Sequence, residues 1–223
     1  MRPPAIVEAA VSKGLAMIAI CDHNSAGNVA ATQEAAGRGL AVIAGIEVTT
    51  AEEVHVLGLF PGAWAARAVG EEVRATLPEA TPASARFGEE LLLDARGEIR
   101  GREGKLLSAA SSLSLNEAIE SIHRRNGLAI ASHVDRRAFS VIGQLGMFPR
   151  EAAFDGIEVS AAGVASGRVA EFAGLGLPVL CSSDSHFLSE VGTGLTVLEL
   201  REPTFGELAL ALRGLGGRRC CHA

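Results

Sequence analysis

Short apolar runs alternate along the chain with longer stretches in which apolar residues recur at helical spacing. This alternation predicts strands and helices in succession, as in repeated βα units around a parallel sheet. The predicted strands are residues 17–20, 40–44, 46–50, 54–60, 128–132, 156–160, 178–182 and 195–200. The predicted helices are residues 4–13, 26–36, 62–76, 115–125, 139–145, 165–175 and 203–212. We therefore expect an α/β protein with enough parallel strands for a TIM-like barrel.

Two places interrupt this alternation. The predicted strands 46–50 and 54–60 are too close together for a helix between them, so we expect them to pair as a hairpin. Residues 77–112 follow neither spacing and contain the turn signal DARG at 94–97, which predicts a second hairpin. We interpret residues 77–112 as an insertion or lid within a single domain that spans residues 1–223.

The composition narrows the classes of partner. The 223 residues are 48% hydrophobic and 21% charged, which fits one globular domain that folds without disulfides or a structural metal. Any bound metal is therefore expected to serve chemistry. The formal net charge is -6, so the chain has no excess of basic residues for holding nucleic acid as a stable partner. Nucleic acid is then possible only as a substrate.

The cysteines and the apolar runs bear on location. Cys21 and Cys181 are isolated and Cys220 and Cys221 are adjacent, so neither a disulfide framework nor a zinc ribbon is indicated. Reduced thiols suit the cytoplasm. No apolar run approaches the ~20 residues of a membrane span, and no signal-peptide pattern opens the chain. We expect a cytoplasmic protein without a membrane partner.

Ionisable side chains gather at the carboxyl ends of the predicted strands. The residues found there are Asp22, His23, Glu47, His133, Asp184 and His186. In a parallel barrel these ends meet on one face, which is where active sites are built. His55 lies inside a strand on the same side as Leu57, and we expect it to point into the barrel.

Imidazoles and carboxylates in apolar surroundings are costly to bury unless a cation compensates their charge and polarity. Imidazole mixed with carboxylate suits divalent Zn, Mn or Fe. A single histidine at a strand end is more often a capped or solvated residue. Six such residues at successive strand ends favour a metal site instead.

Other catalytic schemes have less support. The sequence contains no GxSxG elbow, no GxxxxGK[ST] loop and no GxGxxG motif after a strand, which argues against a serine nucleophile and against nucleotide-cofactor loops. Cys21, beside Asp22 and His23, offers a thiolate nucleophile as an alternative. A small apolar residue that closes a buried strand is the simpler interpretation of Cys21.

Five segments together resemble the PHP (polymerase and histidinol phosphatase) family of metal-dependent phosphoesterases. They are IAICDHN at 18–24, GIEV at 45–48, VHVLG at 54–58, ASH at 131–133 and SDSH at 183–186. Their order and spacing match over nearly the whole chain. The resemblance implies a distorted (β/α)7 barrel that carries up to three metal ions and hydrolyses phosphate esters.

The resemblance also implies ligand roles. Glu47 matches the family's bridging carboxylate, and His55 and His133 match the other two ligands of the same metal. Asp184 matches a ligand of a second metal that shares Glu47, while His23 and His186 match two ligands of a third. The first site is complete on this comparison, and the other two are short of ligands.

The chain departs from the family pattern at its beginning. The family opens with a strand bearing an HxH motif, whereas Met1 already lies within the first predicted helix. We favour a start upstream of Met1 over a real truncation, because a barrel without one strand exposes two unpaired edges. A real truncation would leave a reduced site, or one completed by a neighbouring chain in a homo-oligomer. Residues 220–222 (CCH) could replace the lost ligands, but a disordered terminus is the simpler interpretation.

Several other polar residues allow two interpretations. Arg136, three residues after His133, has the geometry to clamp a phosphate group, and a surface arginine in a charged loop is an equally good interpretation. Lys105 and Arg102 in the insertion are weaker candidates of the same kind. His123 suits the last turn of its helix and is expected to be structural. Glu158 lies in a strand where its side chain could face the site, and it is a candidate for contacting the metal ligands without binding the metal.

We expect metal-dependent hydrolysis of a phosphomonoester or phosphodiester by a metal-activated water, with Arg136 and Asp22 as catalytic residues. The expected partner is a small phosphorylated substrate or nucleotide. Two alternatives stay open: a metal-binding barrel without turnover, and an amidohydrolase-type C–N hydrolase with similar ligands at its strand ends.

Overall fold

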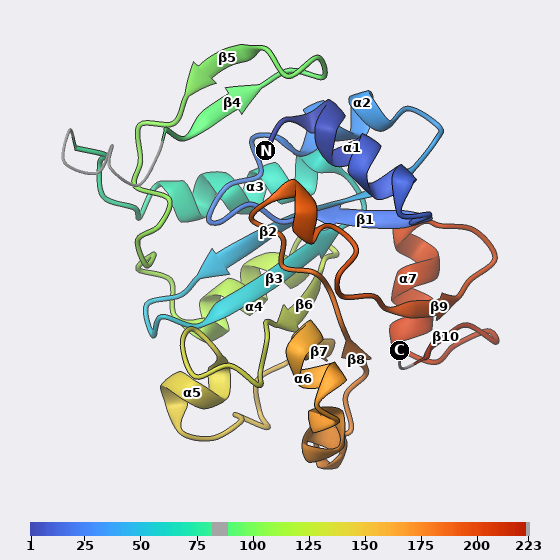
Figure 1. Ribbon diagram of the computed structural model, residues 1–223. Coiled ribbons are helices and arrows are strands. Elements are labelled where there is room, and N and C mark those ends of the chain that lie inside the picture. The colour runs from blue at the N-terminus through green and yellow to red at the C-terminus, as the bar shows by residue number, and fades with distance from the viewer. Residues whose placement is uncertain (82–88, 222–223) are drawn as a thin grey trace.

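The computed structural model describes residues 1–81 and 89–221 (Figure 1). Its elements in chain order are α1 (Pro3–Ser12), β1 (Met17–Ile20), α2 (Val29–Ala36), β2 (Ala41–Thr49), β3 (His55–Phe60), α3 (Ala63–Arg74), β4 (Leu91–Leu93), β5 (Ile99–Arg102), α4 (Leu115–His123), β6 (Leu128–Ala131), α5 (Val141–Leu145), β7 (Gly156–Glu158), α6 (Ala161–Ala165), the 3₁₀ helix η2 (Arg168–Leu175), β8 (Val179–Leu180), the 3₁₀ helix η3 (Leu188–Glu190), β9 (Val197–Glu199), α7 (Phe205–Leu212) and β10 (Arg219–Cys221). Within these residues, none of the helices is both long and apolar enough to cross a bilayer.

Six strands form one curled, mixed sheet in the order β1-β2-β3-β6-β7-β8 (Figure 1). β3 runs antiparallel to both of its neighbours, and the other pairs are parallel. The predicted hairpin is therefore confirmed, and β3 also pairs antiparallel with β6, which the expected succession of parallel strands did not include. Only five residues separate β2 from β3, which is too few for the crossover that a parallel pair requires. The mixed α/β class is confirmed, whereas a closed (β/α)7 barrel stays a prediction.

β2 is a single long strand where the sequence predicts two, at 40–44 and 46–50. Gly45 lies between the two predicted ranges, and its role is a close approach of β1. A Cβ atom at Gly45 would lie 2.4 Å from the Sγ atom of Cys21 and 2.9 Å from the carbonyl oxygen of Ile20. The glycine therefore admits the neighbouring strand and does not end its own.

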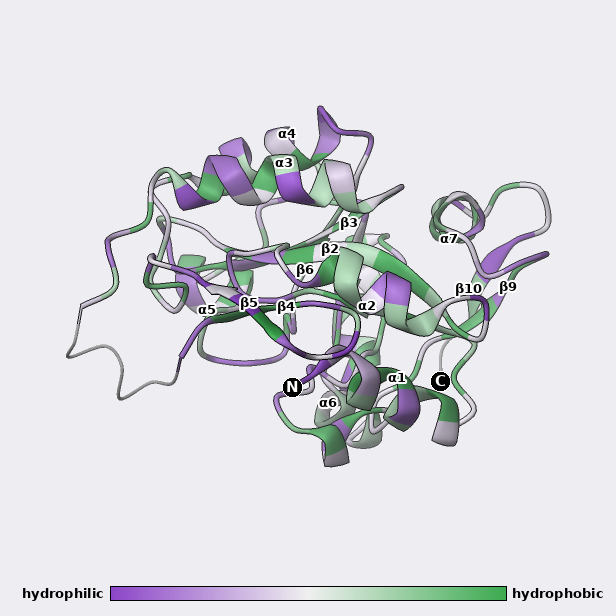
Figure 2. Cartoon of the chain, turned by 90° about the horizontal axis from the view of Figure 1, so that it is seen from above, coloured by the Kyte–Doolittle hydropathy of each residue, from purple (hydrophilic) through white to green (hydrophobic). Residues whose placement is uncertain are grey.

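Helices cover both faces of the sheet. Figure 2 shows α3 and α4 lying side by side along one face, where Val69 and Ile122 pack with Val48 and Val56 of the sheet. On the opposite face, which we call the inner face, Leu208 and Leu212 of α7 pack against the strands. Because strand side chains alternate between the faces, β2, β3 and β7 carry apolar residues on the outer face and also place polar residues, Glu47, His55 and Glu158, on the inner face.

Three other predictions need correction. The predicted helix 165–175 is mostly the 3₁₀ helix η2, which Gly167 in a left-handed conformation separates from the short helix α6 before it. The predicted helix 139–145 begins only at Val141, because Phe139 is also left-handed and Ser140 caps the helix. The predicted strand 195–200 does not join the main sheet. Its core, β9, pairs with β10 instead.

The end of the chain is partly ordered, against the expectation of a disordered terminus. Residues 219–221 form β10, and the Sγ atom of Cys220 donates to the carbonyl oxygen of Val179 at 3.1 Å. His222 lies outside the described residues. The side chain of Cys220 is thus used in packing the terminus onto β8.

The insertion contains the predicted hairpin, formed by β4 and β5, which projects from one end of the molecule (Figure 1). The side chain of Asn28 ties this hairpin to the body, donating to Leu91 O at 3.1 Å and accepting from Leu93 N at 2.9 Å. Residues 82–88 of the predicted insertion lie outside the described residues.

Candidate metal centre

The candidate site lies on the inner face of the sheet, near the carboxyl end of β2 and the start of β3. Ile43 of β2 and Leu59 of β3 belong to the inner apolar cluster with Leu208. By alternation, Glu47 shares the inner face with Ile43, and His55 shares it with Leu59. His55 thus lies on the same face as Glu47, while its position inside a closed barrel stays a prediction.

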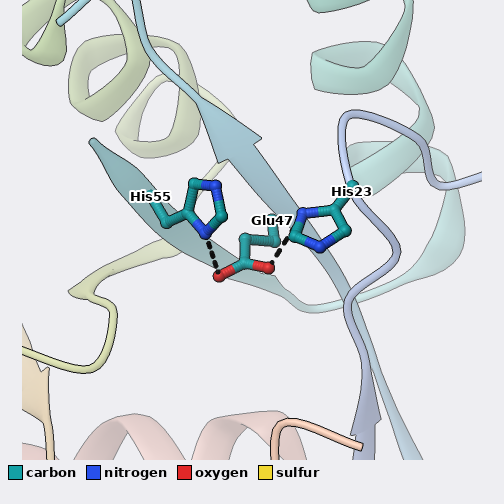
Figure 3. A group of neighbouring side chains, drawn as sticks. All are labelled: His23, Glu47 and His55. Carbon is teal, nitrogen blue, oxygen red and sulfur yellow. Dashed lines mark ion pairs between the residues drawn. The ribbon is translucent and has the colours of Figure 1, made fainter. Parts of the chain in front are cut away.

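Glu47 lies at the centre of the site (Figure 3). Its Oε2 atom is 3.1 Å from Nδ1 of His23, and its Oε1 atom is 3.2 Å from Nδ1 of His55. Nε2 of His133 is 3.7 Å from the same Oε1 atom. Three imidazoles from three different strand ends therefore surround one carboxylate.

The donor atoms suit a divalent ion. One donor atom from each of His23, Glu47 and His55 lies within 4.8 Å of the other two, so a single ion can reach all three. Imidazole nitrogen with carboxylate oxygen is the mixed donor set of Zn, Mn or Fe sites. The chemistry of the residues thus fits the metal that the sequence predicts.

His133 supplies a second observation of fit. Its Nε2 atom lies 3.3 Å from Nδ1 of His55, whereas its Nδ1 atom is buried without a hydrogen-bond partner in the part of the chain that the structure describes. A buried polar atom left without a partner costs about 1–3 kcal/mol. The backbone of His133 is also held at a φ of 29°. Unsatisfied polar atoms and left-handed backbone of this kind occur at functional sites more often than elsewhere.

The charges favour the ligand forms of these side chains. Burial opposes ionisation of Glu47, but the hydrogen bonds and charges of His133, His55 and His23 outweigh it and hold the pKa of Glu47 below its usual range. Burial also lowers the pKa of His23, although Glu47 opposes that effect. A carboxylate and a neutral imidazole are the forms that bind metal.

Asp184, His186 and Arg136 form the edge of the site. Nη1 of Arg136 lies 2.5 Å from Oδ2 of Asp184, and Nδ1 of His186 lies 4.0 Å from Oδ1 of the same carboxylate. The ring of His186 is 5.8 Å from that of His23. The structure thus brings Asp184 and His186 next to the central cluster but not into contact with Glu47.

The side chain of Asp22 contacts Asn28, whereas that of His23 contacts Glu47. The Oδ2 atom of Asp22 accepts a hydrogen bond from Asn28 at 3.4 Å, and burial raises the pKa of Asp22. The charge of His23 acts in the opposite direction and lowers this pKa, and the catalytic role of Asp22 stays a prediction. Burial likewise raises the pKa of Cys21 well above its ordinary value, so the thiolate needed for the nucleophile alternative is disfavoured.

The other candidates are paired elsewhere. Lys105 forms an ion pair with Glu79 at 2.6 Å, and Arg102 forms one with Glu89 at 3.2 Å. Nε2 of His123 lies 2.8 Å from Oδ2 of Asp155, which agrees with a structural role. Glu158 is buried on the inner face and accepts a hydrogen bond from Ser182 Oγ at 2.6 Å.

Two residues near the site were not expected from the sequence. The buried side chain of Asn24 accepts from Thr49 N at 2.8 Å and donates to Leu107 O and Ala109 O at 2.9 Å, so it joins the β1 loop to β2 and to the insertion. The ring of Phe139 stacks on His55. An asparagine after a strand is a weak signal for such a turn, and the sequence holds no signal for Phe139.

The fold and the cluster define a class. A curled α/β sheet with imidazoles and a carboxylate at its carboxyl edge supports a metal-dependent hydrolase. The PHP domain matches residues 1–181, and a PHP-associated region matches residues 168–214. The chain belongs to the PHP family. No protein of curated function matches its sequence.

Solved structures share this fold. Endonuclease Q, a lesion-specific endonuclease from Pyrococcus furiosus, superposes with a TM-score of 0.65 and 20% identity over 97% of this chain and 52% of the endonuclease chain. This chain therefore spans about half the length of that enzyme. A predicted metal-dependent phosphoesterase from Bifidobacterium adolescentis superposes with a TM-score of 0.57 and 19% sequence identity. The match covers 87% of this chain and 86% of the phosphoesterase chain. An amidohydrolase from Chromobacterium violaceum superposes with a TM-score of 0.60 and 21% sequence identity, again over 87% of this chain and 86% of the other chain.

Proposed function

We propose that this chain hydrolyses phosphate esters with the help of divalent metal ions held around Glu47. The observation that carries the proposal is the convergence of His23, His55 and His133 on the one carboxylate of Glu47. One donor atom from each of His23, Glu47 and His55 lies within 4.8 Å of the other two. Family membership supports the same class of reaction.

The proposed roles divide the site into a centre and an edge. Glu47, His55, His133 and His23 would hold the first ion, and Asp184 and His186 would contribute to a second or third. Bound ions would supply a nucleophile from water near neutral pH and withdraw charge from the phosphoryl oxygens. Asp22 stays a candidate catalytic residue on sequence grounds alone.

Arg136 is the proposed contact to the phosphoryl group. Its Nη1 atom is engaged by Asp184, but a guanidinium has five N–H donors, and its side chain is 44% exposed. The free N–H groups are able to neutralise charge that builds up on a phosphoryl oxygen.

The charge around the site favours a small phosphorylated substrate or nucleotide over long nucleic acid. Lys105 and Arg102, the other candidate cations, are neutralised by Glu79 and Glu89. Binding to a duplex draws on many phosphate contacts from free Lys and Arg side chains. The endonuclease Q structure holds a 27-mer duplex with an abasic lesion, so such a duplex belongs in the substrate panel as the opposing case.

The test compares Glu47→Ala with the matched control Glu120→Ala, an exposed carboxylate on α4. Metal content per chain is measured by plasma mass spectrometry. Hydrolysis of an aryl phosphomonoester, an aryl phosphodiester, a cyclic amide and a 27-mer duplex with an abasic lesion is measured with Mn, Fe or Zn added. We expect Glu47→Ala to lose both metal and phosphoester hydrolysis, and Glu120→Ala to keep both. Phosphoester hydrolysis that survives in Glu47→Ala contradicts the proposal, and turnover of the cyclic amide alone favours a C–N hydrolase.

A metal-binding barrel without turnover is the second candidate. The observation that favours it is the position of Asp184, which is held by Arg136 and stands apart from the compact group of His23, Glu47 and His55. In that case the wild-type chain retains one ion and hydrolyses none of the panel, whichever metal is added.

A further inference from the structure

Phe139 lies against the candidate site in an unusual conformation. Its φ angle is 57°, in the left-handed region that bulky side chains rarely adopt. The ring is 41% exposed, so burial of the ring in the core does not explain why this conformation is kept. A backbone of this kind persists only where the surroundings determine it.

The surroundings that determine it are in the loop after β6. Ser140, which is fully buried, donates through Oγ to Arg136 O at 2.5 Å and accepts from Gly143 N at 2.9 Å. Gly143 has no room for a side chain, because a Cβ atom there would lie 2.1 Å from Arg137 O. The loop that carries His133 and Arg136 is therefore pinned on both sides of Phe139.

Phe139 contacts His55 in two ways. Its carbonyl oxygen accepts a hydrogen bond from the backbone N–H of His55 at 2.8 Å. Its ring lies parallel to the imidazole, with the centroids 4.7 Å apart and the planes inclined by 15°. Stacked pairs at this separation are attractive and fix the relative orientation of the two rings.

We propose that Phe139 is a positioning residue that holds the imidazole of His55 in the orientation in which Nδ1 faces Glu47 and His133. Metal-binding histidines are usually oriented by a hydrogen bond from their second nitrogen to a carboxylate or a carbonyl group. Here we assign this role to the stacked phenyl ring, while the backbone contact fixes the start of β3. The proposal deepens the proposed function and rests on it, because the orientation of His55 matters through the metal that it would bind.

Three variants separate positioning from packing. Phe139→Gly removes the ring and relieves the left-handed backbone, Phe139→Tyr keeps a stacking ring, and Phe187→Ala removes a more exposed ring beside His186 as the control. The affinity for Zn is measured by calorimetry, the ring-proton shifts of His55 by NMR without metal, and the melting temperature by scanning calorimetry.

We expect Phe139→Gly to weaken Zn binding by about 10–100-fold and Phe139→Tyr to stay close to the wild type. The ring-current shift of the His55 protons disappears in Phe139→Gly and persists in Phe139→Tyr. The melting temperature of Phe139→Gly stays equal or rises, because the strain of the left-handed residue is removed. Phe187→Ala matches the wild type in all three measurements.

Unchanged His55 ring-proton shifts in Phe139→Gly overturn the positioning role, and so does a Zn affinity equal to that of the wild type. A Phe139→Tyr variant as weak as Phe139→Gly does the same. If the wild type itself binds no metal, the proposed function fails, and the NMR comparison alone then decides whether Phe139 orients His55.

Discussion

Arg136 and Asp184 are joined across the edge of the candidate site by an ion pair of 2.5 Å, although they are 48 residues apart in the chain. Arg136 lies in the loop after β6, and Asp184 lies in the loop after β8 with a left-handed φ of 44°. The pair therefore links two strand ends on either side of β7. It also places a cation beside a candidate metal ligand.

Replacing Arg136 by Gln should weaken the binding of inorganic phosphate to the metal-loaded chain by about 10–100-fold, since a hydrogen bond between charged groups is worth roughly 1.5–3 kcal/mol. Calorimetric titration with phosphate in the presence of Mn measures this effect. Arg137→Gln, the neighbouring arginine, serves as the control and should change little. Equal phosphate affinity in the Arg136 and Arg137 variants would show that Arg136 does not contact the anion.

Asn24 should be one of the more sensitive positions for stability. Its buried side chain makes three hydrogen bonds and its φ is 52°. Asn24→Ala leaves Thr49 N, Leu107 O and Ala109 O without this partner, which should lower the free energy of unfolding by about 3 kcal/mol or more. Asn24→Gly loses the same bonds but relieves the left-handed backbone, so it should be about 1 kcal/mol more stable than Asn24→Ala. Urea unfolding of both variants gives the two numbers, and a reversed order would contradict this account of the turn.

Much of the fold could be predicted because the relevant forces are local. Apolar runs and helical spacing located the alternating elements, and the short connection after β2 predicted its hairpin with β3. The errors arise where tertiary contacts override local pattern. Gly45, between two predicted strands, lies within one continuous strand and accommodates Cys21, and the left-handed Gly167 delays the predicted helix 165–175 until Arg168.

The central site could also be predicted, because polar residues at strand ends must meet on one edge of a sheet. His23, Glu47, His55 and His133 were expected together and are together. Phe139 could not be predicted, because its left-handed backbone depends on a loop pinned by Ser140 and by the lack of a side chain at Gly143. Contacts of that kind produce no periodic pattern of apolar and polar residues in the sequence.

The inner apolar cluster below the site depends on α7. Leu208 is buried there against the strands, so Leu208→Ala should lower the free energy of unfolding by about 2–5 kcal/mol through the cavity it leaves. Leu210→Ala, on a less buried position of the same helix, should cost clearly less. Urea unfolding measures both changes, and similar costs for the two variants would place α7 off the inner face.

Glu158 should make stability depend on pH in the direction opposite to an ion-paired carboxylate. Burial raises the pKa of Glu158 to about 7, although Ser182 and His133 act to lower it. The folded chain therefore binds this proton more tightly than the unfolded chain, whose Glu pKa is near 4.5. The stability associated with the proton is fully present below the unfolded pKa and is lost as the pH rises through about 7. Relative to Glu158→Gln, the wild type should lose on the order of 2–3 kcal/mol between pH 5 and pH 8.

Urea unfolding of the wild type and Glu158→Gln at several pH values tests this dependence. Ser182→Ala provides an internal check, because it removes a hydrogen bond that lowers the pKa of Glu158. The loss of stability in Ser182→Ala should accordingly extend to a higher pH than in the wild type. If the wild-type and Glu158→Gln stabilities run parallel from pH 5 to pH 8, Glu158 is not protonated near neutrality in the folded chain. The buried inner face would then hold a permanent negative charge beside Glu47, and its cation would have to balance both carboxylates.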